Sequence, residues 1–196
     1  MPRIVDHNQR RREIVEVTWR FIAKQGFDKL NLRDLSAAAG YANGGLKTYF
    51  PNRDAILIAT FNYVADSTSR RIAEKTANLQ GVEAIRAFAL EVLPLDEERR
   101  DEGRVAVHFW HLALGEPELA EVNAVAMDRW RTMLDGWLVD VLGDGHRGAV
   151  VARDSLLNFM LGAQGASVLD ARANTVQSLV EQLEYQLRAL ELLPRQ

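Results

Sequence analysis

The chain has 196 residues, enough for one large domain or for a small domain joined to a larger one. Hydrophobic residues make up 47% and charged residues 26%, close to the average of folded proteins, which argues against an intrinsically disordered chain. The sequence has no cysteine, which excludes disulfides and thiolate metal sites, and it has no apolar run long enough for a secretory signal or a membrane span. We therefore expect a cytoplasmic protein without a membrane partner.

The net charge of −3 is distributed unevenly along the chain. Residues 1–62 hold ten Lys and Arg against six Asp and Glu, so the remaining residues carry an excess of seven negative charges. A basic N-terminal segment followed by an acidic remainder is what local attraction to phosphate requires, whatever the net charge of the whole chain.

Helical periodicity dominates, and no stretch alternates like an exposed strand, so the sequence predicts an all-α fold of about nine helices. The first is expected over residues 7–25, because Gly26 follows it as a C-cap. The second starts at Asn31, which has Asp34 three residues later, and stops at Gly40. A third follows over 42–48, and two short helices across a glycine-containing turn predict a helix-turn-helix.

Pro51 and Asn52 then break the chain before a long helix over 53–77. We place the domain boundary here, with a head at 1–52 and a larger helical body at 53–196. In the body the sequence predicts helices over these ranges: 82–94, 98–114, 117–142, 149–170 and 173–193.

The last of these helices has apolar residues at alternating spacings of four and three: Val176, Val180, Leu183, Leu187 and Leu190. This spacing is typical of a helix-packing seam. The seam can join helices of one chain or of two subunits, and the spacing alone does not decide between them.

Residues 26–57 carry the most informative motif. They resemble the DNA-binding signature of the TetR family at Gly26, Phe27, Leu32, Leu35, Ala38, Ala39, Gly40, Gly44, Leu46, Tyr49, Phe50, Arg53 and Leu57. A head this small needs a shared core, which we expect from Phe21, Phe27, Leu35, Leu46 and Phe50. The alternative is a helical hairpin in an unrelated fold.

The resemblance implies that the third helix enters a major groove of double-stranded DNA. The expected contact residues are Arg33, Ala42, Asn43, Gly44, Gly45, Lys47, Thr48, Tyr49 and Arg53. Asn43 and Lys47 are the candidates for base edges, and Tyr49 and Arg53 for phosphates. Ala42 replaces the usual Ser or Thr cap, at a cost of roughly 1 kcal/mol, and Lys47 replaces a common aromatic residue. The run at 10–12 is either a solvated helix start or a contact to the DNA backbone.

Residues 82–196 resemble the ligand domain of choline-responsive betaine-pathway repressors, through the run starting at Leu93, through Phe109-Trp110 and through Pro117-Glu-Leu. This implies a cavity for a small-molecule effector, and the candidates to line it are Phe88, Val92, His108, Phe109, Trp110, Met127, Trp130, Met133 and Phe159. Each of these can equally be ordinary core. Trp110 or Trp130 would suit a quaternary amine through cation–π contact. His108 and His111 can line the pocket, pack or bind a metal, and we expect neither metal nor cofactor.

The same resemblance implies a homodimer built from the last two helices. The expected interface residues are Leu156, Met160, Ala163, Leu179, Leu183, Leu187 and Leu190. Two subunits would place two recognition helices about one DNA turn (~34 Å) apart, as a palindromic operator requires.

These features predict a repressor that a small molecule releases from its operator. An enzyme is the main alternative class. However, the GxGxxG match at residues 143–148 follows a helix rather than a strand, and the acids at Asp96, Glu97, Glu98, Asp101 and Glu102 form a charge run typical of a solvated helix end. We expect no catalysis. A regulator whose body is filled with side chains and takes no ligand remains the other alternative.

Overall fold

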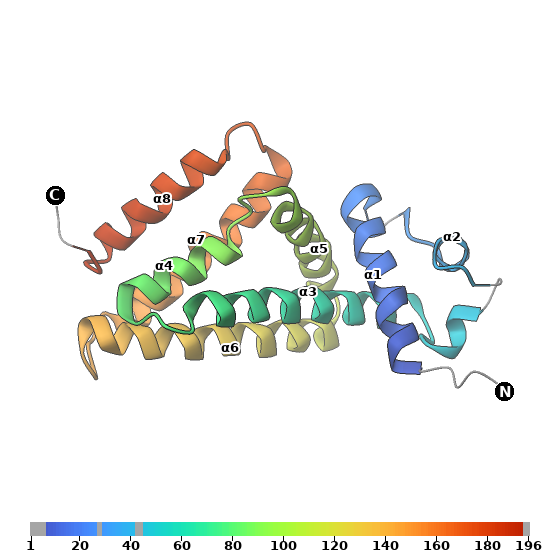
Figure 1. The fold of residues 1–196 in the computed structure, drawn as a ribbon, viewed down its shortest axis with the longest axis horizontal. Coiled ribbons are helices and arrows are strands. Elements are labelled where there is room, and N and C mark those ends of the chain that lie inside the picture. The colour runs from blue at the N-terminus through green and yellow to red at the C-terminus, as the bar shows by residue number, and fades with distance from the viewer. Residues whose placement is uncertain (1–6, 27–28, 42–44, 194–196) are drawn as a thin grey trace.

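The computed structural model describes residues 7–26, 29–41 and 45–193, and every regular element within these ranges is helical. The head contains α1 (His7–Gln25), α2 (Leu32–Ala38) and the 3₁₀ helix η2 (Gly45–Thr48), and it lies at one end of the molecule (Figure 1). The body contains α3 (Arg53–Thr76), α4 (Gly81–Val92), α5 (Glu97–Ala113), α6 (Pro117–Leu142), α7 (Ala149–Leu169) and α8 (Val176–Ala189). The predicted all-α fold is confirmed.

Local sequence signals mark several helix ends. The side-chain oxygens of Asn31, Asn52 and Asp96 each accept a hydrogen bond of 2.8 Å from a backbone N–H of the following helix. Gly26, with φ +83°, ends α1 in the left-handed conformation that glycine adopts without strain. Helix α4 ends two residues earlier than predicted, because Leu93 precedes a proline and is extended (ψ 141°).

The third predicted helix differs most from expectation. Its described part is the four-residue 3₁₀ turn η2, whereas residues 42–44 lie outside the described ranges. A 3₁₀ turn rises faster per residue than an α-helix, so η2 is a short, tight turn that leads directly into Phe50 and the start of α3.

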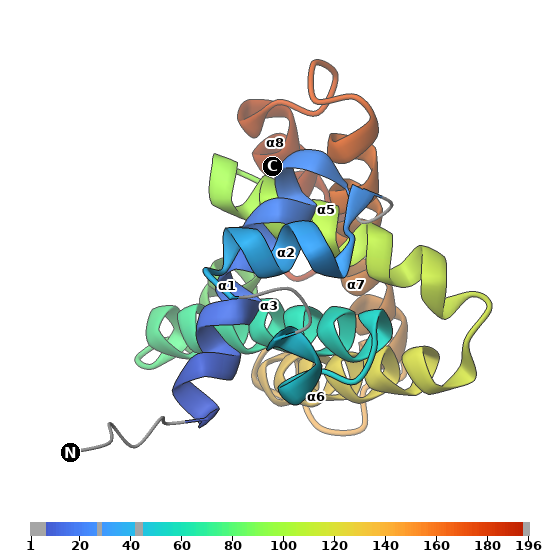
Figure 2. The same ribbon diagram turned by 90° about the vertical axis from the view of Figure 1, so that its right-hand side faces the viewer.

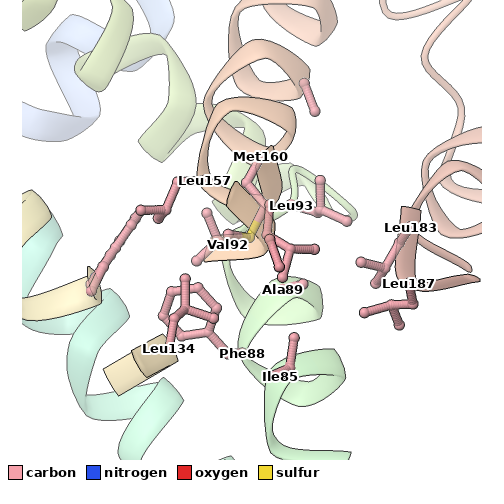
Figure 3. Packing of buried hydrophobic residues seen from close by; sticks show 14 of the residues in the cluster. Ile85, Phe88, Ala89, Val92, Leu93, Leu134, Leu157, Met160, Leu183 and Leu187 are labelled. Atoms are coloured by element: carbon pink, nitrogen blue, oxygen red, sulfur yellow. The ribbon is translucent and has the colours of Figure 1, made fainter. Parts of the chain in front are cut away.

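Two hydrophobic clusters hold the described residues together. The first joins the head to the neighbouring ends of α3, α5 and α6, and it runs from Ile14, Leu35 and Phe50 to Phe61 and Phe109. The second fills the body between α3, α4, α6, α7 and α8 (Figure 3). Phe109 stacks on Phe61 with ring centroids 3.9 Å apart, so α5 is packed directly against α3 at the junction of head and body.

Helix α3 is the element that both clusters share. Its first turns bury Ile56 and Leu57 in the head cluster, and Ile72 near its other end is buried in the body cluster. Figure 1 shows this helix running as one continuous rod from the head along the body. None of the described helices combines the length and the low charge that a membrane span needs.

Candidate functional site

The outward end of the head is built around η2 and α2, which face the viewer in Figure 2. Leu35, Leu46 and Phe50 are fully buried, as predicted for the core, and Phe21 is half-buried against the same cluster. Phe27, also predicted as core, lies outside the described residues. With its apolar side chains turned inward, η2 directs its polar ones toward solvent.

The predicted DNA-contact residues divide into three groups. Arg33, Lys47 and Thr48 are exposed, whereas Gly45, Tyr49 and Arg53 are half-buried. A Cβ at Gly45 would lie 3.4 Å from the Cβ of Tyr41, so one side of this glycine is packed against the head. Ala42, Asn43 and Gly44 lie outside the described residues.

The three arginines at residues 10–12 have different surroundings. Arg10 pairs with Glu13 at 2.7 Å on the surface. The Arg11 guanidinium lies 4.3 Å from the centre of the Phe50 ring and donates a hydrogen bond to the Tyr49 carbonyl. Arg11 therefore ties α1 to the end of η2, while Arg12 is exposed.

A cavity of about 40 Å³ lies in the body, between α3, α5 and α6, with α4 and α7 contributing one or two residues each. It is lined by Phe61, Val64, Ala65, Thr68, Val92, Glu102, Ala106, Trp110, Ala126, Met127, Trp130, Leu161 and Gln164. One water needs roughly 10–15 Å³ of such space. The cavity therefore holds only a few waters, and a larger occupant requires the lining to open.

Four of the nine predicted ligand residues line this cavity: Val92, Trp110, Met127 and Trp130. Phe88 and Phe109 are not part of the lining: both rings are fully buried behind it, Phe88 against Trp130 and Phe109 stacked on Phe61. Met133 and Phe159 also lie outside the lining, packed against the body cluster. His108 instead lies against the head, where its Nε2 is 3.5 Å from the position of a Cβ on Gly26.

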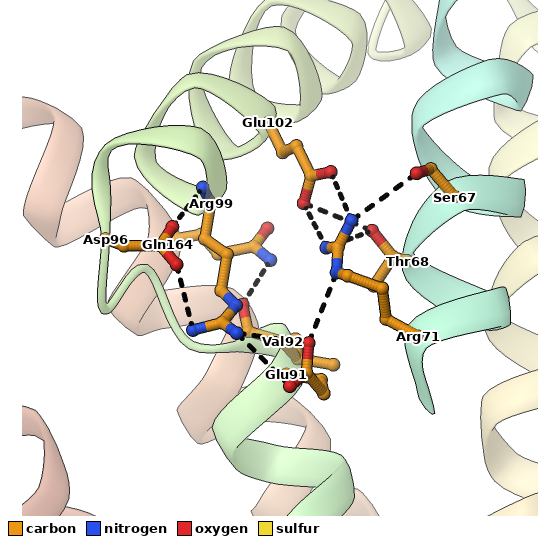
Figure 4. A network of polar contacts seen from close by, with 9 residues as sticks. All are labelled: Ser67, Thr68, Arg71, Glu91, Val92, Asp96, Arg99, Glu102 and Gln164. Atoms are coloured by element: carbon orange, nitrogen blue, oxygen red, sulfur yellow. Dashed lines mark hydrogen bonds and ion pairs between the residues drawn. The ribbon is translucent and has the colours of Figure 1, made fainter. Parts of the chain in front are cut away.

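The polar wall of the cavity belongs to a network that joins three helices (Figure 4). Arg71 on α3 donates to both carboxylate oxygens of Glu102 on α5, at 2.9 and 2.7 Å. The same guanidinium donates to Glu91 on α4 at 3.2 Å. Glu91 also accepts from Arg99, at 3.1 and 3.2 Å. We call Arg71, Glu91 and Glu102 the arginine bridge.

Glu102 is the functional candidate that the sequence analysis missed. We expected it in a solvated charge run, but it is buried and lines the cavity. Its spacing to Val105, Ala106 and Phe109 places it on the inward face of α5, and this pattern was the available signal. Burial raises the pKa of its carboxyl group, and the hydrogen bonds from Arg71 oppose that rise in part.

The one charged side chain in the described lining of the cavity is the carboxylate of Glu102, which is paired with Arg71. The rest of the wall presents the rings of Phe61, Trp110 and Trp130. Trp110 is held by a hydrogen bond of 2.9 Å from its Nε1 to the side-chain oxygen of Asn123. Aromatic rings together with one carboxylate form an environment suited to a small cation that has an apolar body.

The residues expected at the dimer interface lie mostly inside the single chain. Of these seven residues, Leu190 is half-buried and the other six are buried inside the single chain: Leu156, Met160, Ala163, Leu179, Leu183 and Leu187. Figure 3 shows Leu183 and Leu187 pointing from α8 toward α4. The six buried side chains belong to the body core, so a contact to a second subunit would use other faces of α7 and α8.

Comparison with known proteins matches the head and the body separately. Residues 14–60 match the family described as bacterial regulatory proteins, tetR family, and residues 81–190 match the BetI-type transcriptional repressor C-terminal domain. The regulator PksA of Bacillus subtilis is 32% identical over 99 residues, which are 50% of this chain and 48% of PksA. BetI 1 of Chromohalobacter salexigens is 23% identical over 134 residues, 66% of this chain and 65% of BetI 1. The chain thus spans about half to two thirds of these relatives.

Solved structures resemble almost the whole chain. A transcriptional regulator from Rhodococcus sp. Rha1 superposes with a TM-score of 0.85 at 22% identity, over 92% of this chain and 95% of its own. A putative regulator from Saccharomonospora viridis, solved in complex with choline, has a TM-score of 0.82 at 21% identity, over 92% and 96%. The C-terminal match alone covers more than half of the sequence. This chain belongs to the TetR family of bacterial transcriptional regulators and has a BetI-type C-terminal domain.

Proposed function

We propose that this protein is a transcriptional repressor that binds a palindromic DNA operator as a homodimer and releases it when a small cation occupies the body cavity. The observation that carries the proposal is the course of α3. Arg53 at its first residue adjoins the exposed turn η2, and Phe61, Val64, Ala65 and Thr68 further along form a wall of the cavity. One rigid element therefore connects the two proposed binding sites. Because its proposed partners are DNA and a small molecule, we propose that the protein acts in the cytoplasm. It would act by binding and not by catalysis.

The DNA contact is supported by the exposed polar side of the head. Lys47 and Thr48 point away from a core that Leu46 and Phe50 complete, and Arg33 is exposed on the neighbouring helix α2. A lysine on this turn can bind a phosphate or the acceptors of a guanine edge. Tyr49 and Arg53, being half-buried, are proposed to position the turn and to reach the DNA backbone.

Substitution of Lys47 tests the DNA contact. We expect Lys47→Ala to weaken operator binding by at least about fivefold, because a single base or phosphate contact contributes roughly 1–3 kcal/mol. Gel shifts on duplexes selected from a random library by the wild-type protein measure this, and sedimentation checks the oligomeric state. Lys75→Ala, at the other end of α3, is the matched control. Undiminished binding by Lys47→Ala would remove this residue from the interface.

The effector class is supported by the cavity lining, in which Glu102 lies beside the rings of Trp110 and Trp130. The choline complex of the S. viridis regulator makes choline the first compound to test. Its neutral analogue 3,3-dimethylbutan-1-ol has the same shape without the charge. We expect choline to quench or shift tryptophan fluorescence and the neutral alcohol to bind at least tenfold more weakly.

The small volume of the cavity favours one competing function, a regulator that takes no ligand. In that case neither choline nor any compound of a cation library would raise the melting temperature, and operator affinity would not respond to them. Stabilisation by choline with a matching loss of operator affinity would exclude this alternative.

The dimer is proposed to form through the faces of α7 and α8 that point away from the core. On α7, Val151 and Leu169 are exposed at 65% and 86%, with the open glycines Gly162 and Gly165 between them. On α8, Tyr185 is 67% exposed. Apolar side chains around glycines allow a second helix pair to approach closely, as a self-complementary interface requires.

A further inference from the structure

We propose that Arg71 is the residue through which the cavity controls the position of α3. It does so by pairing with two carboxylates, Glu102 on α5 and Glu91 on α4, when the cavity has no occupant, and with Glu91 alone when a cation binds. The inference rests on the proposed function and specifies how the cavity is linked to the DNA-binding head. Without an occupant, Arg71 holds α3 to α5 through Glu102 and to α4 through Glu91. A cation in the cavity engages Glu102 from the other side, and Arg71 then keeps only Glu91.

The geometry of the bridge supports such a change. The pair with Glu102 is bidentate, at 2.9 and 2.7 Å, whereas the contact with Glu91 is a single bond of 3.2 Å. Bidentate guanidinium–carboxylate pairs are the strong and directional form of this interaction. Through Arg71, α3 is therefore attached more firmly to α5 than to α4, and a competitor for Glu102 removes the stronger of these two attachments.

The buried part of the network is balanced in charge. Glu91 and Glu102 supply two carboxylates, and Arg71 and Arg99 supply two guanidiniums (Figure 4). The third carboxylate, that of Asp96, is exposed and pairs with Arg99. Thr68 also donates a hydrogen bond to Glu102, at 3.3 Å, from the wall of the cavity. A cation in the cavity therefore competes with Arg71 for Glu102, because the network holds no spare buried carboxylate.

The position of Arg71 along α3 allows a movement at the arginine bridge to displace the head. Eighteen residues separate it from Arg53, which corresponds to roughly 27 Å of helix at 1.5 Å per residue. A small rotation of α3 at the arginine bridge thus becomes a larger displacement at the head, next to η2. Arg99 meanwhile holds Glu91 in place from α5, so the partner that Arg71 retains does not move away with it.

Operator affinity with and without choline tests the role of Arg71. In the wild-type protein we expect choline to weaken operator binding by a factor within about 5 to 150. In Arg71→Met, choline still binds, because Glu102 is free to receive it, but operator affinity changes less than twofold on adding it. Arg71→Lys, which keeps the charge but not the fork, restores part of the response. Arg70→Met, an exposed neighbour on α3, responds like wild type.

Two further measurements separate the possible failures. If choline does not bind the wild-type protein, the proposed effector class fails. The ligand-free arm then decides on Arg71, because loss of the bridge in Arg71→Met or Glu102→Gln must by itself weaken operator binding at least fivefold. The double variant Arg71→Gln/Glu102→Gln leaves no unpaired charge in this pair and serves where a single variant does not fold. A full choline response in folded Arg71→Met, or unchanged ligand-free affinity in both single variants, would overturn the proposal.

Discussion

Glu102 shows how one residue can change the interpretation of a helix. Burying an ion pair often stabilises a protein no more than a well-packed apolar pair would, because both charges lose their hydration. Stability alone is therefore a weak reason for Glu102 and Arg71 to lie next to the cavity. A carboxylate that faces an aromatic-lined space is better explained by recognition of a cation, with hydrogen bonds from Arg71 opposing the rise in its pKa that burial causes.

The raised pKa of Glu102 predicts a pH dependence of choline binding. Arg71 from α3 favours the charged carboxylate, while burial and Glu98 on α5 favour the protonated form. Above the raised pKa the group is ionised and attracts the cation, and as the pH falls through it, on the way to the ordinary value of 4.5, the attraction is lost. Titration calorimetry should therefore show choline affinity falling with decreasing pH in the wild-type protein.

The Glu102→Gln variant is the control for that measurement. It should bind choline at least tenfold more weakly, with an affinity that stays constant over the same pH interval, because no proton is taken up at residue 102. A wild-type affinity that stays flat down to pH 4.5, or a variant that keeps the full pH dependence, would contradict the assignment of the cation site to Glu102.

At the scale of elements, the sequence predicted helix positions well because the signals for helix ends are local. Asn31, Asn52 and Asp96 cap helices through bonds to residues three positions later, so their effect is visible in a short window. The apolar stripe of the last helix was equally clear, but it did not show which surface covers it. An intramolecular core and a subunit interface impose the same spacing on a helix, and here Leu179, Leu183 and Leu187 belong to the core.

The burial of Leu183 predicts a large effect on stability. Leu183→Ala should lower the free energy of unfolding by about 2–5 kcal/mol, because it leaves a cavity among fully buried side chains of α4, α7 and α8. Urea denaturation followed by circular dichroism measures the change. Glu83→Ala, an exposed position on α4, should stay within about 0.5 kcal/mol. A loss below 1 kcal/mol in Leu183→Ala would place α8 outside the core.

At the scale of the whole molecule, the head was easier to predict than the cavity. The head signature is one continuous stretch, whereas the cavity takes residues from five helices. The consecutive residues His108, Phe109 and Trp110 illustrate the difficulty, because neighbours on a helix point about 100° apart. His108 lies against Gly26, Phe109 stacks on Phe61, and Trp110 lines the cavity. The sequence indicated that this segment lies near the cavity. Only the packing of the helices shows which of its three side chains lines it.

The outer faces of α7 and α8 determine whether two heads can reach one operator. A palindromic site presents its half-sites about 34 Å apart, so a single head makes only half of the contacts. Tyr185 is two thirds exposed on α8, which contributes no residue to the cavity lining, so it is suitable for testing the dimer separately from the effector. An aspartate here would place a charge in the proposed apolar contact without disturbing the core.

We expect Tyr185→Asp to sediment as a folded monomer at concentrations where the wild-type protein is a dimer, and to lose most of its affinity for a full palindrome. It should still bind choline, because the cavity is formed within one chain. Val139→Asp, an exposed apolar position on α6, is the matched control and should remain dimeric. Analytical ultracentrifugation distinguishes the two outcomes directly. A Tyr185→Asp dimer as stable as the wild type would move the interface away from α8 and require another surface to pair the heads.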